Sequence, residues 1–241
     1  MTTEPAELKR AAAAKAIDYV TPGMKLGLGT GSTAEIFLDL LAPRVRGGLS
    51  VIGVPTSEKT AAKARALGIP LATLDELAPL DLVVDGADEA DRELTLIKGA
   101  GGALQREKIV AASAKRMVVI ADESKLVARL GKFPLSVEVL EFGHKTTAAR
   151  IARAAEGLGY NKVAITLRVR GDAIVKSDSG NVIYDCAFGA ITSAAKLAQG
   201  LAGIPGVVEH GLFIGLAQTL LIAHPGEVEV IERETAAAKP V

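Results

Sequence analysis

The chain contains 241 residues, of which 49% are hydrophobic, enough apolar material for the buried core of one large domain or two smaller ones. Lys and Arg together number 28, and so do Asp and Glu. The net charge is therefore zero, and no broad positive field favours nucleic acid or an anionic membrane as a partner.

The N-terminal residues 1–10 contain two glutamates and lack the basic start and apolar stretch of a secretion signal. An alanine-rich helix is predicted at residues 6–19, and it ends before the helix-breaking Thr21-Pro22-Gly23. A short apolar strand is predicted at 25–28. The chain thus begins with one helix that leads directly into a strand.

Between residues 25 and 120, short apolar strands alternate with helical patterns. This alternation is typical of a parallel sheet covered on both faces, and we predict a doubly wound, mostly parallel α/β sheet of the Rossmann-like class. The predicted strands are 25–28, 51–54, 80–84 and 116–120, and helical patterns follow Gly29–Thr33 and Ser57–Thr60 and occupy Gly102–Ala114.

From Leu135 onward the pattern changes to that of a smaller α+β unit. We predict a larger α/β domain at residues 1–134, completed by 207–241, and a smaller α+β domain at 135–206. The elements expected after Leu135 are strand 136–140, a helix near 146–158, a long strand 162–170, a hairpin joining 174–175 to 182–184 through the turn 178–181, helix 191–201, and closing strands near 211–214 and 219–222.

Cys186 is the only cysteine and has apolar neighbours, so we expect a buried thiol that forms no disulfide within the chain. The most apolar late stretch, 211–223, is too short to span a membrane and contains Gln218. We therefore expect a cytoplasmic protein.

A glycine-rich turn, Gly27-Leu28-Gly29-Thr30-Gly31-Ser32-Thr33, joins the first strand to a helix. Its glycines permit close backbone approach, and its hydroxyls can donate to a phosphate at the helix N-terminus. Ser32 occupies the place of the third glycine of a dinucleotide fingerprint, and the Gly-Lys-Ser/Thr ending of a nucleoside-triphosphate loop is missing. The alternative is an ordinary turn with a Ser or Thr helix cap.

An acidic turn, Asp85-Gly86-Ala87-Asp88-Glu89, follows the next apolar strand. Crowded carboxylates repel one another, so at least one tends to keep its proton, which suits an acid or base acting on sugar hydroxyls. A solvated turn is an equally plain explanation, because Asp-Gly is common in turns. The three histidines, His144, His210 and His224, are scattered and predict no zinc site, whereas Mg²⁺ held by carboxylates alone stays open.

A third motif combines a cation, a flexible backbone and a carboxylate: Lys98-Gly99-Ala100-Gly101-Gly102 precedes a helix bearing Glu107. In an aldose–ketose isomerisation one base moves a proton between C2 and C1, while donors stabilise the enediolate oxygen. Glu107 suits the base, and Lys98 with the loop amides suits the oxygen charge. Arg106-Glu107-Lys108 also resembles any solvated helix surface, and Lys98 or Lys125 can be ordinary surface lysines.

In order and spacing, these motifs closely resemble ribose-5-phosphate isomerase of the A type over nearly the whole chain. The resemblance also includes Gly131–Leu135, Gly180–Ile183 and Ile204–Val208. It implies interconversion of ribose 5-phosphate and ribulose 5-phosphate in the non-oxidative pentose phosphate pathway. It implies no metal, nucleotide or other cofactor, and a homodimer or homotetramer in which we expect the smaller domain to take part.

By this resemblance, Glu107 is the proton acceptor, and Asp85, Asp88 and Lys98 share in catalysis. The substrate would be bound by Lys9, Thr30, Gly31, Ser32, Thr33, Asp85, Gly86, Ala87, Asp88, Lys98, Gly99, Ala100, Gly101 and Lys125. Ala100 replaces a more usual glycine or arginine, and Asp185-Cys186-Ala187-Phe188 is unlike other members, which we expect to concern packing or assembly. The alternatives are a non-catalytic sugar-phosphate sensor, an amino-sugar-phosphate deaminase and a phosphogluconolactonase.

Overall fold

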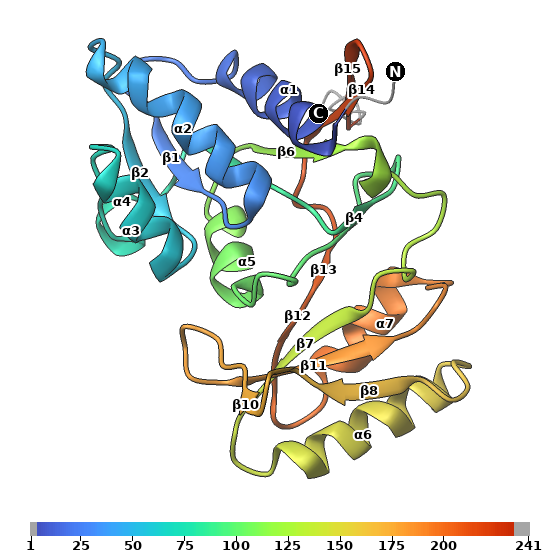
Figure 1. Cartoon of the computed structure of the whole chain (residues 1–241). Helices are drawn as coiled ribbons and strands as arrows, with labels where there is room; N and C mark the ends of the chain where they lie inside the picture. The colour runs from blue at the N-terminus through green and yellow to red at the C-terminus, as the bar shows by residue number, and fades with distance from the viewer. Residues whose placement is uncertain (1–3, 234–241) are drawn as a thin grey trace, which may run out of the picture.

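A six-stranded sheet forms the larger lobe of the computed structural model, which describes residues 4–233 (Figure 1). In space the strands follow the order β15-β14-β6-β3-β1-β2, and all neighbours are parallel except the antiparallel β14–β15 pair. The predicted mostly parallel α/β sheet is confirmed. Its strands are β1 (Lys25–Leu28), β2 (Ile52–Pro55), β3 (Leu82–Asp85), β6 (Met117–Asp122), β14 (Thr219–His224) and β15 (Glu227–Glu232).

The central strands are buried on both faces, which explains their continuous apolar sequences. Leu82 and Val84 of β3 face α1 (Pro5–Ile17) and α2 (Ser32–Arg46), whereas Val83 faces α5 (Leu104–Ala112) on the opposite side. Next to the β2 edge lie α3 (Glu58–Ala66) and α4 (Leu74–Leu77) (Figure 1).

The chain leaves β1 in one direction to reach β2 and then returns to place β3 on the other side of β1. This is a topological switch point, where an open α/β sheet places its ligand site at the carboxyl ends of the strands. The glycine-rich turn follows β1 and the acidic turn follows β3. The topology therefore brings the first two sequence motifs together.

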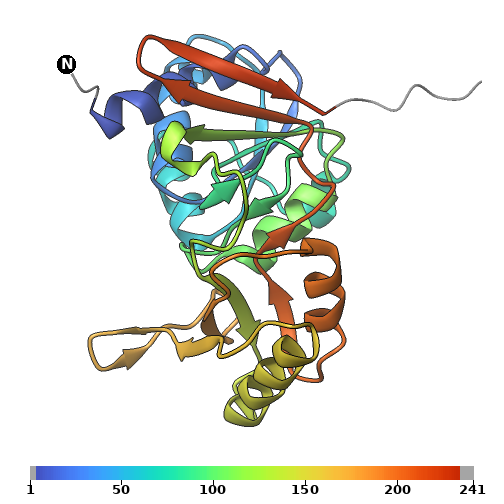
Figure 2. The same ribbon diagram turned by 90° about the vertical axis from the view of Figure 1, so that its right-hand side faces the viewer.

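The smaller lobe contains an antiparallel sheet in the order β12-β7-β11-β8. Two helices cover one face of the sheet and enclose a separate hydrophobic core with it (Figures 1 and 2). The elements of this lobe are β7 (Leu135–Val139), α6 (His144–Gly157), β8 (Ala164–Leu167), β11 (Val182–Ala187), α7 (Ala194–Ala202) and β12 (Val207–His210). The sheet thus includes β12, which the division drawn from sequence places with the first domain.

The predicted hairpin has the wrong partner. β10 (Ala173–Ile174) pairs with β9 (Val169–Arg170), and only an isolated bridge joins Lys176 to Val182. β11 instead lies between β7 and β8. Because β11 is buried from Val182 to Tyr184, its backbone needs hydrogen-bond partners on both edges. The strands β9 and β10 are exposed and project sideways from the smaller lobe (Figure 2).

Other differences from the sequence prediction concern short elements and element ends. The predicted strand 162–170 is two strands, β8 and β9, separated at Arg168. The helix expected from Ile191 begins at Ala194, because the side chain of Ser193 caps it. The strands β12 and β15 were not predicted, although polar and apolar residues alternate from Glu227 to Val230 in β15, as in a half-exposed strand.

A three-stranded sheet in the order β13-β5-β4 lies between the lobes. Its strands are β4 (Glu89–Ala90), β5 (Leu96–Ile97) and β13 (Leu212–Phe213), and the short helix η1 (Glu123–Lys125) follows β6. Lys98 comes directly after β5, and its N–H donates to the carbonyl of Gly211 at 2.8 Å. This small sheet therefore fixes the backbone of Lys98 beside the switch point.

Residues 1–3 and 234–241 lie outside the described residues, so part of the N-terminal segment judged for a secretion signal and the end of the predicted 207–241 segment are not covered. Within residues 4–233, no helix is both long and apolar enough to cross a membrane.

Candidate active site

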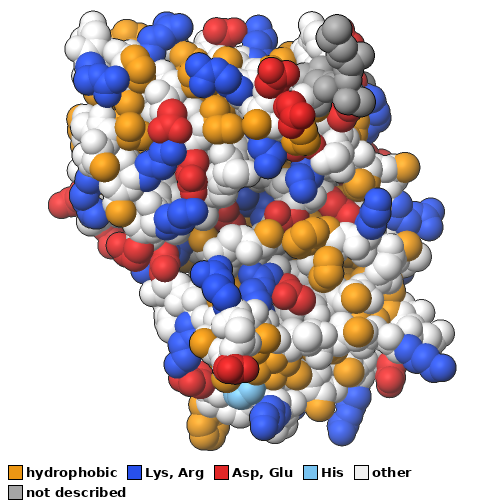
Figure 3. All heavy atoms as spheres, in the orientation of Figure 1, with side chains coloured by type: hydrophobic (Ala, Val, Ile, Leu, Met, Phe, Trp, Pro, Cys, Tyr) orange, Lys and Arg blue, Asp and Glu red, His pale blue; other side chains and the backbone are white. Residues whose placement is uncertain are grey.

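A cavity of about 190 Å³ opens where the two lobes meet, at the carboxyl ends of β1 and β3. Charged side chains of both signs gather in the hollow between the lobes (Figure 3). Every residue predicted to touch substrate lines this cavity except Asp85, and Ala34 and Ala121 join them. The lining residues are Lys9, Thr30, Gly31, Ser32, Thr33, Ala34, Gly86, Ala87, Asp88, Lys98, Gly99, Ala100, Gly101, Glu107, Ala121 and Lys125.

The turn between β1 and α2 forms one end of the cavity. Gly31 has a φ of 118°, which only glycine adopts without strain, and α2 begins at the next residue. The first N–H groups of a helix have no partner within the helix and carry a partial positive charge. The Nζ atom of Lys9, from α1, lies 3.0 Å from the Ser32 hydroxyl oxygen at this end.

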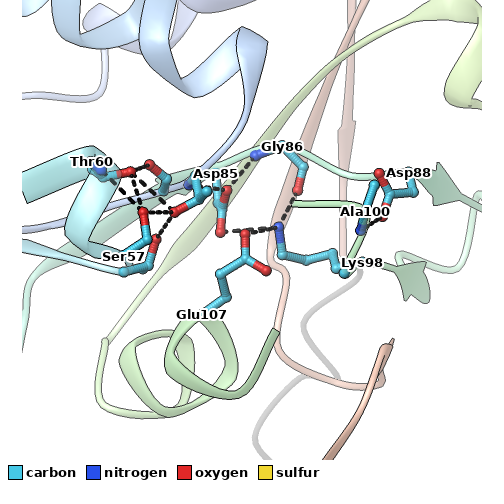
Figure 4. Close-up of polar contacts among 12 residues, drawn as sticks. Ser57, Thr60, Asp85, Gly86, Asp88, Lys98, Ala100 and Glu107 are labelled. Carbon is cyan, nitrogen blue, oxygen red and sulfur yellow. Dashed lines mark hydrogen bonds and ion pairs between the residues drawn. The ribbon is translucent and has the colours of Figure 1, made fainter. Parts of the chain in front are cut away.

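The Thr30 hydroxyl belongs to a cluster of hydroxyl groups that includes Ser57 and Thr60 (Figure 4). Its Oγ1 atom lies 2.7 Å from the hydroxyl oxygen of Thr56, 2.8 Å from that of Ser57 and 3.1 Å from that of Thr60. The Thr56 and Thr60 hydroxyls also donate to the carbonyls of Leu28 and Gly29. The cluster thus fixes the turn, and Thr56, Ser57 and Thr60 were not predicted from the sequence to take part in the site.

Lys98 lies at the other end of the cavity, between two carboxyl groups. Its side chain is 3% exposed, and Nζ lies 3.0 Å from Asp85 Oδ2 and 3.1 Å from Glu107 Oε1 (Figure 4). The ammonium also donates to the carbonyl of Gly86 at 2.7 Å. These nearby carboxylates raise the pKa of Lys98 in spite of its burial, so the side chain stays cationic.

Asp85 is the one predicted substrate contact that lies outside the cavity. It ends β3 and is fully buried behind Lys98. Its Oδ1 atom accepts hydrogen bonds from the N–H groups of Thr30 at 3.1 Å and Gly86 at 2.8 Å. A Cβ atom at position 29 would lie 2.2 Å from this oxygen, so Gly29 is required for the approach. Asp85 therefore connects the two ends of the site.

Glu107 lies in the first turn of α5 and is only 4% exposed, although the sequence around it resembles a solvated helix surface. Burial raises its pKa to about 8, and the Lys98 ammonium opposes this shift while the Asp85 charge adds to it. Three carboxylates surround one lysine, so a proton held by Glu107 relieves part of their repulsion. A carboxyl group with such a pKa can both accept and release a proton near neutral pH.

Asp88 lines the cavity on the far side of the acidic turn from Asp85. Its Oδ2 atom accepts a hydrogen bond from the Ala100 N–H at 2.9 Å (Figure 4). Burial raises its pKa, while the Ala100 bond and the charges of Lys98 and Lys125 lower it. The acidic turn and the glycine-rich loop are thus joined directly at the cavity wall.

Arg168, which was not predicted from the sequence, reaches from the smaller lobe to the loop at Gly99 and Ala100. Among residues 4–233, no three His, Cys, Asp or Glu side chains are arranged to hold a metal ion. The three histidines lie apart, with His144 on Tyr184, His210 beside Lys108 and His224 between two glutamates. Cys186 is buried as predicted, and burial raises its pKa to about 12.

Comparison with known proteins identifies relatives along most of the chain. Residues 52–227 match the family model for ribose 5-phosphate isomerase A (phosphoriboisomerase A). The chain is 55% identical over 226 residues to the ribose-5-phosphate isomerase A of Nitrobacter hamburgensis, covering 94% of this chain and 97% of that protein.

Solved structures agree with this result. The ribose 5-phosphate isomerase of Plasmodium falciparum superposes with a TM-score of 0.90 at 37% identity, covering 95% of this chain and all of that one. A D-ribose-5-phosphate isomerase in complex with phospho-erythronic acid superposes with a TM-score of 0.88 at 36% identity, covering 96% and 100%.

Proposed function

The chain belongs to the ribose 5-phosphate isomerase A family, and from that membership we propose how its cavity carries out the reaction. It is an aldose–ketose isomerase that interconverts D-ribose 5-phosphate and D-ribulose 5-phosphate through an enediolate. The sensor, deaminase and lactonase alternatives have no observation in their favour.

The observation that carries the mechanism is the buried Glu107 carboxyl group at the cavity wall, next to a lysine. In the open-chain substrate, Glu107 would remove the proton from C2 and return it to C1, and the reverse reaction follows the same path. Its Oε1 atom is bonded to Lys98, while among residues 4–233 no protein group donates to Oε2. That second oxygen would face the substrate carbons.

Lys98 and Asp88 would control the charge that develops on the substrate oxygens. The Lys98 ammonium would stabilise the enediolate oxygen, and in a water-poor site such a preorganised charge acts more strongly than in water. Asp88 would exchange a proton with a substrate hydroxyl, since burial raises its pKa. Asp85 has no access to the cavity, so we assign it the task of holding Lys98 and the Thr30 amide in place.

The phosphate would bind at the other end of the cavity. The open N–H groups at the start of α2 suit an anion, and the Ser32 and Thr33 hydroxyls and Lys9 lie at the same place. Lys125 also lines the cavity, and its charge lowers the pKa of Asp88. A relative that is 36% identical has been solved in complex with phospho-erythronic acid, a phosphorylated sugar acid, which supports a phosphorylated ligand for this family.

We further propose a homodimer or homotetramer that works in the cytoplasm, in the non-oxidative pentose phosphate pathway. Apolar side chains on the smaller lobe support an assembly through this lobe, because Phe142 is 96% exposed and Leu140 and Val169 are each at least half exposed. The single cysteine, buried and free, supports a reducing compartment.

Substitution Glu107→Gln tests the assignment of the base. We expect kcat for ribose 5-phosphate to fall by about 10²- to 10⁴-fold with little change in KM, because general acid–base catalysis has this magnitude. The exposed helical glutamate Glu156 offers a matched control, and Glu156→Gln should keep full activity. A coupled assay measures both variants, with and without a chelator, and thermal unfolding verifies their folding.

Retention of wild-type turnover by a folded Glu107→Gln variant would remove Glu107 from the mechanism. In parallel, the wild-type enzyme should turn over ribose 5-phosphate and leave glucosamine 6-phosphate and 6-phosphogluconolactone unchanged.

A further inference from the structure

Arg168 connects the smaller lobe to the active-site loop. It lies between β8 and β9, and its side chain is 14% exposed. Its guanidinium donates to the carbonyls of Gly99 at 2.8 Å and Ala100 at 3.3 Å. Both of these loop residues line the cavity, whereas Arg168 itself does not.

The guanidinium group is itself held in a fixed orientation. Nε donates to Asp185 Oδ2 at 2.9 Å, and Nη2 contacts the other oxygen of the same carboxylate. Nη2 also donates to the Ser136 hydroxyl at 2.7 Å. Asp185 and Ser136 belong to neighbouring strands of the small sheet, β11 and β7. A rigid β-sheet therefore orients the group that contacts the loop.

The loop needs such support because its conformation is unusual. Gly99 has a φ of 123°, and a Cβ atom there would lie 2.6 Å from Ser136 Cβ. The loop thus passes directly over the small sheet, in a conformation that other residues rarely adopt. The Gly99 carbonyl accepts the Gly102 N–H at 3.0 Å within the loop, and Arg168 adds a donor from the small sheet to this oxygen and to the Ala100 carbonyl.

Fixing the two carbonyls also fixes the two amides that follow them. In a planar trans peptide the C=O and N–H groups point in opposite directions. The Gly99 carbonyl faces Arg168, and the Ala100 N–H of the same peptide donates to Asp88 at 2.9 Å. The Ala100 carbonyl also faces Arg168, so the Gly101 N–H points away from the guanidinium.

We propose that Arg168 is a positioning residue of the isomerase: by holding the Gly99 and Ala100 carbonyls, it directs the Gly101 N–H and the Asp88 carboxylate toward the substrate. The inference rests on the proposed role of this cavity as the active site. The smaller lobe thereby takes part in the reaction without contacting the substrate.

A guanidinium group is required for this task. Its planar fork reaches four groups at once: two carbonyls, a hydroxyl and a carboxylate. A lysine ammonium carries the same charge but has a single nitrogen, so it cannot span these acceptors. The Arg168→Lys variant therefore shows whether Arg168 acts through the geometry of its hydrogen bonds or only through its charge.

The test compares Arg168→Ala with Arg168→Lys and with the control Arg170→Ala, which removes an exposed arginine two residues away. For Arg168→Ala we expect kcat to fall by about 10²-fold, the cost of misplacing groups at a reacting centre. Arg168→Lys should remain at least tenfold below wild type, and Arg170→Ala should match wild type. Adding guanidinium ion to Arg168→Ala, at concentrations that do not unfold it, should raise kcat at least tenfold.

Three results would overturn the inference: wild-type kcat in Arg168→Ala, full activity in Arg168→Lys, or no response to guanidinium in a folded Arg168→Ala. If Arg168→Ala does not fold, Asp185→Asn decides, because it keeps the guanidinium and removes its carboxylate support. We expect about a tenfold lower kcat in that variant, and an unchanged kcat would again overturn the inference.

Glu107→Gln is measured in the same series to separate the two questions. An inactive Glu107→Gln beside a fully active Arg168→Ala would reject only the role of Arg168. An active Glu107→Gln would reject the proposed site itself.

Discussion

The two ends of the cavity use different physical means. At one end, the buried carboxyl groups of Asp85 and Glu107 lie 3.0 and 3.1 Å from the buried Lys98 ammonium. At the end formed by the β1–α2 turn, backbone N–H groups and hydroxyls predominate, and the nearest cation, Lys9, is partly exposed. One end buries its charged groups, whereas the other offers backbone dipoles and a partly exposed lysine.

This difference matches the demands of the two halves of a sugar phosphate. A phosphate keeps its charge throughout the reaction, so its site needs only to bind, and helix N-terminal amides do so without a buried ion. The enediolate charge appears only during the reaction, and groups that stabilise it act best when preorganised away from water. Substitutions at the two ends should therefore change different quantities.

The largest effect is expected at the buried end, from Lys98→Met. Removing one partner of a buried ion pair costs about 3–5 kcal/mol because the remaining charges are left uncompensated. We expect the free energy of unfolding to fall by about that amount, together with a loss of kcat. Urea unfolding and the coupled assay measure the two quantities.

Lys115→Met is the matched control for Lys98→Met, because Lys115 forms an exposed ion pair with Asp81. Exposed pairs contribute at most about 1 kcal/mol, so this change should have little effect. Equal unfolding free energies for the two variants would contradict the contrast drawn between buried and exposed charges.

The second-largest effect is expected in the pH dependence of kcat/KM, which reflects the ionisation of Glu107 at the buried end. Burial raises the pKa of Glu107 to about 8, and the groups that face it are Lys98, Asp85 and Asp88. Because the free base must be ionised, kcat/KM should rise about tenfold per pH unit below 8 and then level off. The substrate phosphate titrates near pH ~6, well below this limb. A flat profile between pH 7 and 8 would contradict the assignment.

Stability should change in the opposite direction over the same range. The native state keeps a proton on Glu107 at pH values where the unfolded chain, with the ordinary value of 4.5, has released it. Glu107 therefore makes its full contribution to the free energy of unfolding below pH 4.5. This contribution decreases as the pH rises from 4.5 toward 8. In Glu107→Gln this contribution to the slope disappears, which thermal unfolding at several pH values can measure.

The contrast between the ends also explains what sequence analysis could predict. The glycine-rich turn, the acidic turn and the Lys98 loop are contiguous motifs that follow strands, so the topology alone brings them to one place. Asp85 and Asp88 share a turn, yet the structure buries the first and opens the second to the cavity. Local sequence does not contain that distinction, because it depends on how Lys98 packs against the end of β3.

Residues from distant segments were harder to predict. Thr56, Ser57 and Thr60 are unremarkable at a helix start until Thr30 is placed among them. Arg168 resembles any arginine on an exposed strand, and its role depends on a contact across 69 positions of sequence. The wrong partner in the predicted hairpin has the same cause, since β11 is paired by strands that are remote from the turn.

The smallest effect is expected at the phosphate end, from Lys9→Ala. A partly exposed charge contributes about 1 kcal/mol or less to binding, so KM should rise by about fivefold while kcat stays unchanged. Lys15→Ala, on the same helix and paired with Asp18, is the control and should leave both constants unchanged. Salt screens exposed charges over about 8–10 Å, so the Lys9→Ala effect should shrink as salt is added, whereas that of Lys98→Met should persist. If Lys9→Ala instead lowers kcat and is insensitive to salt, then this end also acts on the transition state, and the division between a binding end and a reacting end no longer holds.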